Sequence, residues 1–208
     1  EDPLGFYGLL AHREIQEPVK LLTANDRSIS SVTGPERELL DEHMDTNYIE
    51  WLISVGEEPL AKDYLDNMAK QLRRHPNISN ETWTGLFNYY AKSGSYISLF
   101  SQLGNLDPEQ RKIVLAMNPQ LIFPKPYYEH VTESANRFGI SPEFIYSIMR
   151  QESAFDPRAR SHMDAFGLMQ LIPKVAQKSA EAFNIRFEKP EDLYDPQTSI
   201  SLGAAHLR

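Results

Sequence analysis

Short runs of apolar residues at helical spacing, separated by proline and glycine, constrain this chain most strongly. Between Pro59 and Arg74, for example, apolar side chains recur at steps of three and four residues, as on one face of an α-helix. Similar stripes come before and after this segment. Beyond Pro173 no strand-like alternation stands out between the last predicted helices. The sequence therefore predicts an all-α fold.

The predicted helices of the first half are short and close together, and they include one over Leu4–Ile15. Paired short helices favour stacked antiparallel hairpins, as in an α-solenoid, although no fixed-period repeat is present. The segment Phe123-Pro124-Lys125-Pro126 predicts an extended connector, because a residue before proline avoids the helical conformation. We therefore predict a helical-array domain over 1–123 and a second helical domain over 124–208.

Composition excludes several classes of protein. The 208 residues contain no cysteine, so disulfides, zinc–cysteine sites and thiol nucleophiles are excluded. The histidines lack the paired spacing of a metal site, and we expect no metal and no cofactor. A net charge of -8 gives no electrostatic reason to bind nucleic acid. No apolar run is long enough for a transmembrane segment.

A catalytic role is predicted for Glu152. A helix is expected to begin at Ser141, and its apolar stripe of Ile145, Ile148 and Met149 leads one turn later to Glu152. Burial on that stripe and the negative end of the helix dipole would both raise the pKa of this carboxyl group. A carboxylic acid that keeps its proton near neutral pH suits general-acid catalysis. The alternative is a solvated helix end.

The segment after this helix is rich in candidate binding residues. Ser161 to Ala165 is predicted to be a polar turn, followed by a short apolar segment that Pro173 closes. Gly167 would allow the close approach of a ligand or of a second backbone, and Gln170 carries both donor and acceptor groups. Taken singly, these residues are better explained as a turn glycine and a surface amide than as binding residues.

Together, these residues resemble a known family. Arg150-Gln151-Glu152-Ser153-Ala154-Phe155, Ser161 and Gly167-Leu168-Met169-Gln170, in this order and spacing, resemble the catalytic domain of the soluble lytic transglycosylases that cleave bacterial peptidoglycan. The similarity runs from about Tyr127 to Arg208. It implies a lysozyme-like α-helical catalytic domain in which Glu152 is the sole acid and base. The substrate-binding residues that it implies are Ser161, Gly167, Gln170 and Ile172, which match positions lining the sugar-binding groove, with Met169 adjacent to them.

The sequence departs from the family pattern in two places. Asp164 stands where the family usually has a glycine before its Ala-x-Gly-Leu-Met-Gln run. The later Ala-Tyr-Asn motif of the family has no counterpart before Arg208. We therefore expect the catalytic domain to be incomplete at its C-terminus, with exposed apolar surface through which the chain could associate.

The resemblance implies a specific reaction and location. It implies non-hydrolytic cleavage of the β-1,4 bond between N-acetylmuramic acid and N-acetylglucosamine in peptidoglycan glycan strands, which leaves 1,6-anhydro-muramyl ends, in the bacterial periplasm. Two alternatives remain open. Asp156 or Asp164 could serve as a second carboxylate in a hydrolytic muramidase. The chain could also be a catalytically incomplete glycan-binding or scaffold protein.

Overall fold

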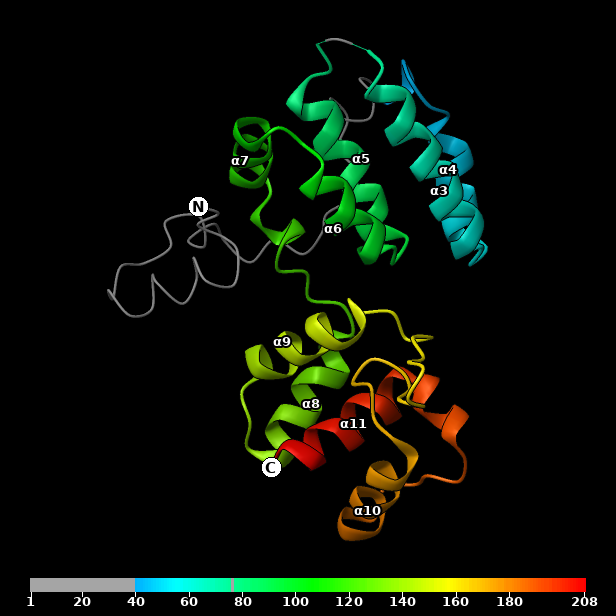
Figure 1. Cartoon of the computed structure of the whole chain (residues 1–208), viewed down its shortest axis with the longest axis vertical. Helices are drawn as coiled ribbons and strands as arrows, with labels where there is room; N and C mark the ends of the chain where they lie inside the picture. The colour runs from blue at the N-terminus through cyan, green and yellow to red at the C-terminus, as the bar shows by residue number, and fades with distance from the viewer. Residues whose placement is uncertain (1–39, 76) are drawn as a thin grey trace, which may run out of the picture. The chain divides into compact units, whose positions relative to one another are not determined.

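The computed structural model describes residues 40–75 and 77–208, and helices make up its regular structure there (Figure 1). In chain order the elements are α3 (Thr46–Ser54), α4 (Glu58–Leu72), α5 (Asn80–Lys92), α6 (Tyr96–Gly104), α7 (Pro108–Met117), the 3-10 helix η2 (Pro119–Leu121), α8 (Tyr128–Phe138), α9 (Pro142–Ser153), α10 (Pro173–Phe183), the 3-10 helix η3 (Pro190–Tyr194) and α11 (Pro196–Leu207). The all-α prediction is confirmed. The predicted helix over Leu4–Ile15 lies outside the described residues.

The chain divides into two compact units. The described part of the first unit comprises residues 40–75, 77–92 and 102–124, and the second comprises 93–101 and 125–208. The sequence assigns residues 93–101 to the first domain, yet they pack with the second unit. The assignment of 1–123 and 124–208 as separate domains stays a prediction.

Helices that are neighbours in the sequence pack together in the first unit. α4 packs against α3 and α5, and α5 in turn packs against α7 and η2. α5 is the most buried of these helices, with all residues from Thr82 to Ala91 buried. This packing fits a helical array, because α3, α4 and α5 pack on one another in chain order and α5 then packs against α7. The solenoid description stays a prediction.

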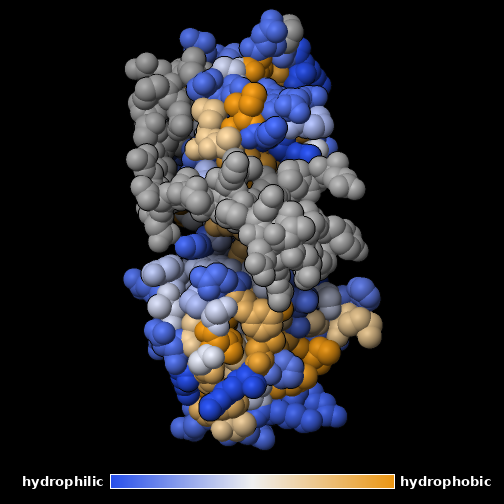
Figure 2. All heavy atoms as spheres, turned by 90° about the vertical axis from the view of Figure 1, so that its left-hand side faces the viewer, coloured by the Kyte–Doolittle hydropathy of each residue, from blue (hydrophilic) through white to orange (hydrophobic). Residues whose placement is uncertain are grey.

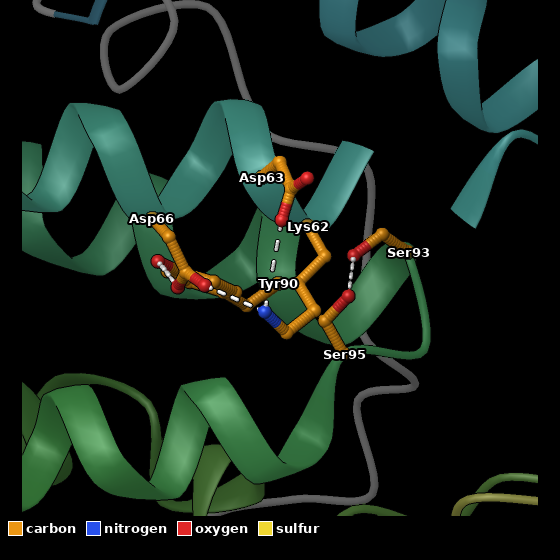
Figure 3. Close-up of polar contacts among 6 residues, drawn as sticks. All are labelled: Lys62, Asp63, Asp66, Tyr90, Ser93 and Ser95. Carbon is orange, nitrogen blue, oxygen red and sulfur yellow. Dashed lines mark hydrogen bonds and ion pairs between the residues drawn. The ribbon is translucent and has the colours of Figure 1, made fainter. Parts of the chain in front are cut away.

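Two successive tyrosines of α5 reach carboxylates on other helices. Tyr89 Oη donates a hydrogen bond to Glu50 Oε1 (3.0 Å), and Tyr90 Oη donates to Asp66 Oδ1 (2.7 Å). Asp66 also accepts a hydrogen bond from Lys62 Nζ (2.8 Å; Figure 3). Burial, together with the bond to Asp66, raises the pKa of Tyr90 far above its usual value. These bonds give the buried hydroxyl groups partners and join α5 to α3 and α4.

α11 lies at the centre of the second unit. It packs against α8, α10 and η3, while α9 packs on α8 (Figure 1). Its residues Ser199, Ile200 and Leu202 to Ala205 are buried, and its first turn is capped by Asp195, which accepts a hydrogen bond from the backbone N–H of Thr198. Small side chains in α11 let its neighbours approach closely.

Some apolar side chains of the second unit remain exposed. They include Tyr128 and Phe144, and Figure 2 shows orange apolar atoms on one face of this unit, in the lower half of the view. Association through such a surface stays a prediction. Within residues 40–75 and 77–208, none of the helices combines the length and apolar character needed to cross a bilayer.

Candidate active site

α9 carries Glu152 in its last turn. Ser141 caps the helix, as predicted, because its Oγ accepts a hydrogen bond from the backbone N–H of Phe144 (3.2 Å). The buried residues of the helix are Ile145, Met149 and Ser153, at steps of four. This row faces the interior of the second unit and fixes the orientation of the helix.

Glu152 lies beside that buried row and is exposed. The expectation that it sits on the buried face of α9 is therefore wrong. The stripe was extended through Ile148, but Ile148 is only half-buried and marks the edge of the apolar face. The next buried position is taken by Ser153 instead.

Ser153 connects the end of α9 to the segment that follows it. Its Oγ lies 2.9 Å from the carbonyl oxygen of Met149 in the preceding turn and 2.9 Å from that of Leu168. The residue is buried, so if these contacts were lost, the buried polar groups would have no hydrogen-bond partner and no water to replace it. Ser153, the residue after Glu152, thus ties the end of α9 to the loop that carries the predicted binding residues.

The chain turns sharply after α9 through two residues with positive φ. Ala154 has φ 47° and Phe155 has φ 66°, a conformation that disfavours residues with a side chain. The backbone N–H groups of Ala154 and Phe155 donate to the carbonyl oxygens of Arg150 (3.2 Å) and Met149 (3.4 Å). This pattern closes the helix in the manner of a Schellman turn, without glycine.

Burial of Phe155 offsets the cost of that turn. Its ring lies 5.3 Å from the ring of Tyr96 in an edge-to-face arrangement and 6.4 Å from that of Phe100. Arg150 of α9 lies over Phe100, with 4.8 Å between the guanidinium carbon and the ring centroid. Burial lowers the pKa of Arg150. Residues 93–101 therefore contribute aromatic support to the helix end that carries Glu152.

Residues 159–171 form a compact loop closed by backbone hydrogen bonds. The N–H of Gly167 donates to the carbonyl of Ala159 (2.8 Å), and Phe166 and Leu171 exchange two bonds of 3.0 and 3.1 Å. These pairs give the isolated antiparallel bridges in this part of the chain. The backbone bonds fix the internal shape of the loop, and the bond between Ser153 Oγ and the carbonyl of Leu168 ties it to α9.

Two of the predicted binding residues hold this loop with their side chains. Gln170 has φ 46°, and its Nε2 donates to the carbonyl oxygens of Ala159 (3.1 Å) and Gly167 (3.0 Å). Ser161 Oγ accepts hydrogen bonds from the backbone N–H groups of Met163 (3.2 Å) and Ala165 (3.1 Å). Both side chains therefore shape the turn, and their contacts with substrate stay a prediction.

Gly167 and Met169 are buried against the C-terminal part of the unit. A Cβ on Gly167 would lie 1.9 Å from the carbonyl oxygen of Leu193, so a second backbone occupies the space. Met169 packs on Gly203 of α11, where an added Cβ would lie 2.6 Å from Met169 Cγ. The N–H of Met169 also donates to Ser199 Oγ (3.3 Å). Of the two explanations open for Gly167, a ligand or a second backbone, the structure shows the backbone of Leu193.

Asp164 and Ile172 lie at the surface of the loop. Asp164 has φ 54°, a conformation that glycine adopts freely and aspartate tolerates. Its Oδ1 accepts a hydrogen bond from Arg160 Nη2 (2.7 Å). Ile172, which precedes α10, is 48% exposed. Among the predicted binding residues Ile172 is thus the most accessible apolar side chain.

Sequence reasoning missed the residues that support this site. Ser153, Phe155, Leu193 and Ser199 were not singled out individually. The serine of the Glu-Ser pair was a local signal, because a small polar residue at a buried helix position needs a partner. Leu193 and Ser199 lie roughly thirty residues from their partners in the loop, and no local pattern indicates such contacts.

Comparisons with known proteins agree with this arrangement. Residues 129–208 match the family model described as "Transglycosylase SLT domain". A provisionally named soluble lytic murein transglycosylase of Haemophilus influenzae is 30% identical over 98% of the chain, and the soluble lytic murein transglycosylase of Escherichia coli K12 is 29% identical over 98%. The chain spans only 31% and 29% of these two relatives.

Solved structures of lytic transglycosylases have a similar fold. The 70 kDa soluble lytic transglycosylase of Escherichia coli matches 98% of the chain with a TM-score of 0.62 and 25% identity, and the chain covers 30% of it. The lytic transglycosylase Slt of Pseudomonas aeruginosa matches 99% of the chain with the same TM-score and 24% identity, and the chain covers 31% of it. Residues 129–208 thus match the transglycosylase SLT domain family, and the chain is similar to soluble lytic transglycosylases over almost all of its length.

Proposed function

We propose that this chain cleaves the glycan strands of peptidoglycan as a lytic transglycosylase, with Glu152 as its only acid and base. The bond cleaved is the β-1,4 bond between N-acetylmuramic acid and N-acetylglucosamine, and the product ends in 1,6-anhydro-N-acetylmuramic acid. The observation that carries the proposal is the exposed carboxylate of Glu152 at the end of a rigidly held helix, inside the matched transglycosylase domain.

The reaction needs one carboxyl group in two protonation states. The acid form of Glu152 donates its proton to the glycosidic oxygen while the bond to C1 breaks and positive charge develops on the sugar. The carboxylate then takes the proton of the sugar's own C6 hydroxyl, whose oxygen bonds to C1. No water is consumed. A glycan lying over the exposed side chain would exclude water from the carboxyl group, a condition that favours proton donation.

Two observations favour this reaction over hydrolysis. A hydrolytic enzyme would usually use a second carboxylate, and Asp156 and Asp164, which follow Glu152 in the sequence, are the two candidates considered above. Asp156 Oδ1 accepts a hydrogen bond from the backbone N–H of Arg158 (2.8 Å), and Asp164 is paired with Arg160. Both carboxylates are thus engaged in local turns, so a mechanism that uses Glu152 alone is preferred.

The substrate determines the location and the binding residues that we propose. Peptidoglycan lies in the bacterial envelope, so we propose that the chain acts in the periplasm. Ile172, on the surface beside the loop, would contact the apolar face of a sugar ring. Ser161, Gly167, Met169 and Gln170 would act by shaping the backbone that faces the glycan.

Muropeptide analysis of sacculi incubated with the chain tests the proposal. We expect anhydro-muramyl products that carry no label when the reaction is run in heavy-oxygen water, since hydrolysis alone would introduce solvent oxygen. Glu152→Gln should abolish the products while changing the free energy of unfolding by less than about 0.5 kcal/mol, because the side chain is exposed.

A matched control is Glu143→Gln, which removes another exposed carboxylate from the same helix and should retain activity. Labelled products would mean a muramidase. No products from the wild-type chain, with glycan binding retained, would mean a glycan-binding protein. Equal loss of activity in both variants would contradict the role of Glu152.

A further inference from the structure

The hairpin of α3 and α4 in the first unit exposes a group of large apolar side chains. Trp51 is 55% exposed and Tyr48 43%, both on α3. Val55, the C-cap residue of α3, is 51% exposed, and so is Leu60 of α4. Ile49 and Leu52 of α3 are fully buried, so the helix is apolar on two sides. An isolated exposed apolar residue needs no explanation, but a contiguous group of them marks an interaction surface.

Ring contacts join these side chains into one surface. Tyr48 stacks on Trp51 with 6.0 Å between ring centroids, and it meets Tyr64 of α4 edge-on at 5.2 Å. Val55 follows Trp51 by one helical turn, and Leu60 precedes Tyr64 by one turn. We call the surface made by Tyr48, Trp51, Val55, Leu60 and Tyr64 the hairpin face.

Hydrogen bonds keep the hairpin face in a fixed shape. The backbone N–H of Asp45 donates to Tyr64 Oη (2.9 Å), and the carboxylate of Asp45 caps α3 through the N–H of Tyr48 (3.1 Å). At the other end, the N–H of Glu57 donates to the carbonyl of Leu52 (2.9 Å) and closes the turn between the helices. A rigid surface with tryptophan and tyrosine at its centre has the composition of binding hot spots.

The surroundings of the hairpin face are acidic. Residues 45–66 contain six carboxylates and one lysine. Lys62, the single cation, already bonds to Asp66 and lies 3.9 Å from Asp63. Exposed carboxylates flank the face at both ends: Asp45 lies at the start of α3, and Glu57 and Glu58 lie at the turn into α4. This arrangement repels anionic membranes, nucleic acids and anionic glycan strands, and it attracts cations.

We propose that the hairpin face binds a positively charged amphipathic segment of a partner protein. Apolar side chains of the segment would cover Trp51 and Tyr48, while its lysine or arginine residues would pair with the carboxylates at the two ends. This inference goes beyond the proposed function, because it concerns the helical array and not the glycan site.

Fluorescence titration of the 208-residue chain tests the proposal with two synthetic helical peptides. One peptide has leucine on one face and lysine on the other, and the second has glutamate in place of each lysine. We expect saturable binding of the lysine peptide only, with an affinity that weakens as salt is added. Trp51→Ser should weaken binding by about tenfold or more, as for an interfacial tryptophan. The double variant Glu57→Gln, Glu58→Gln should weaken it less and reduce the salt dependence.

Matched controls lie on α7 of the same unit. Ile113→Ser removes an apolar side chain that is also about half exposed, and Glu109→Gln removes an exposed carboxylate from the first turn of α7. The proposal would be overturned if both control variants weakened binding of the lysine peptide as much as the hairpin variants do. Binding of the glutamate peptide would also overturn it, as would Trp51-dependent binding of a neutral chitin oligosaccharide. A concentration-dependent dimer that Trp51→Ser abolishes would overturn it as well, because the face would then be a self-association surface.

Discussion

Replacing Gly167 by alanine should destabilise the second unit strongly. Gly167 has φ +70°, and a Cβ there would lie 1.9 Å from the carbonyl oxygen and 2.9 Å from the carbonyl carbon of Leu193. Ordinary contact begins near 3.4 Å, so the backbones would have to separate by about 1.5 Å. Leu193 is fully buried in η3, which packs against α11, so it cannot move without disturbing that packing.

A second glycine separates the two causes of the expected loss. Gly139 also has φ +70°, but a Cβ there would meet no atom within 4 Å. Both substitutions carry the penalty of a left-handed conformation, roughly 1–2 kcal/mol. Only Gly167→Ala adds overpacking of a dense core, about 1–3 kcal/mol. We expect about 3 kcal/mol or more for Gly167→Ala and about 1 kcal/mol for Gly139→Ala.

Hydrogen exchange in increasing urea measures these changes where they occur. Both tryptophans, Trp51 and Trp83, lie in the first unit, so their fluorescence does not follow the second. Exchange of backbone amides in α9 and α11, detected by mass spectrometry, reports the opening of the second unit. Equal losses for the two variants would refute the packing argument. A Gly167→Ala variant of unchanged stability that fails to bind glycan would show that the glycine serves the substrate.

Three further results are expected from other parts of the chain. Ser153→Ala should destabilise the second unit by about 1–3 kcal/mol, whereas Ser147→Ala, at an exposed position with only a local bond, should change little; both are followed by exchange in α9. Tyr90→Phe should destabilise the first unit by roughly 1–2 kcal/mol in a urea titration followed by tryptophan fluorescence. Backbone hydrogen bonds hold the pKa of Asp192 below its usual range. Its contribution to stability is therefore present above the pKa of the unfolded state and is lost as the pH falls through the pKa of the folded state. Asp192→Ala should remove this loss of stability at low pH, as measured by hydrogen exchange over a pH series.

The helices could be predicted because their signals are local. Spacing of apolar residues and the capping residues Ser141 and Asp107 depend only on neighbours within four positions. The short connections between them fix much of the array order as well. Local signals therefore sufficed for the fold class.

The environment of Glu152 could not be predicted in the same way. Steps of three and four residues both stay near one helix face, so Ile148 and Glu152 fitted the stripe as well as Met149 and Ser153 did. The helix that packs against the stripe decides which row is covered. Ser153 completes the buried row because the carbonyl of Leu168 offers it a partner, and that partner comes from a loop fifteen residues later.

The exposure of Glu152 is consistent with the chemistry that we propose. A polymer cannot reach a carboxyl group that the protein has already buried, so the acid of a glycan-cleaving enzyme must stand at the surface before substrate binds. The position of the exposed carboxylate must then be fixed by the residues next to it. Ser153 and Phe155 are buried on either side of the strained turn at Ala154, and the ring contacts of Phe155 and the bonds of Ser153 offset the cost of the positive φ values. Burial of these neighbours, in place of burial of Glu152 itself, fixes the end of α9, where we propose that the carboxylate meets the glycan.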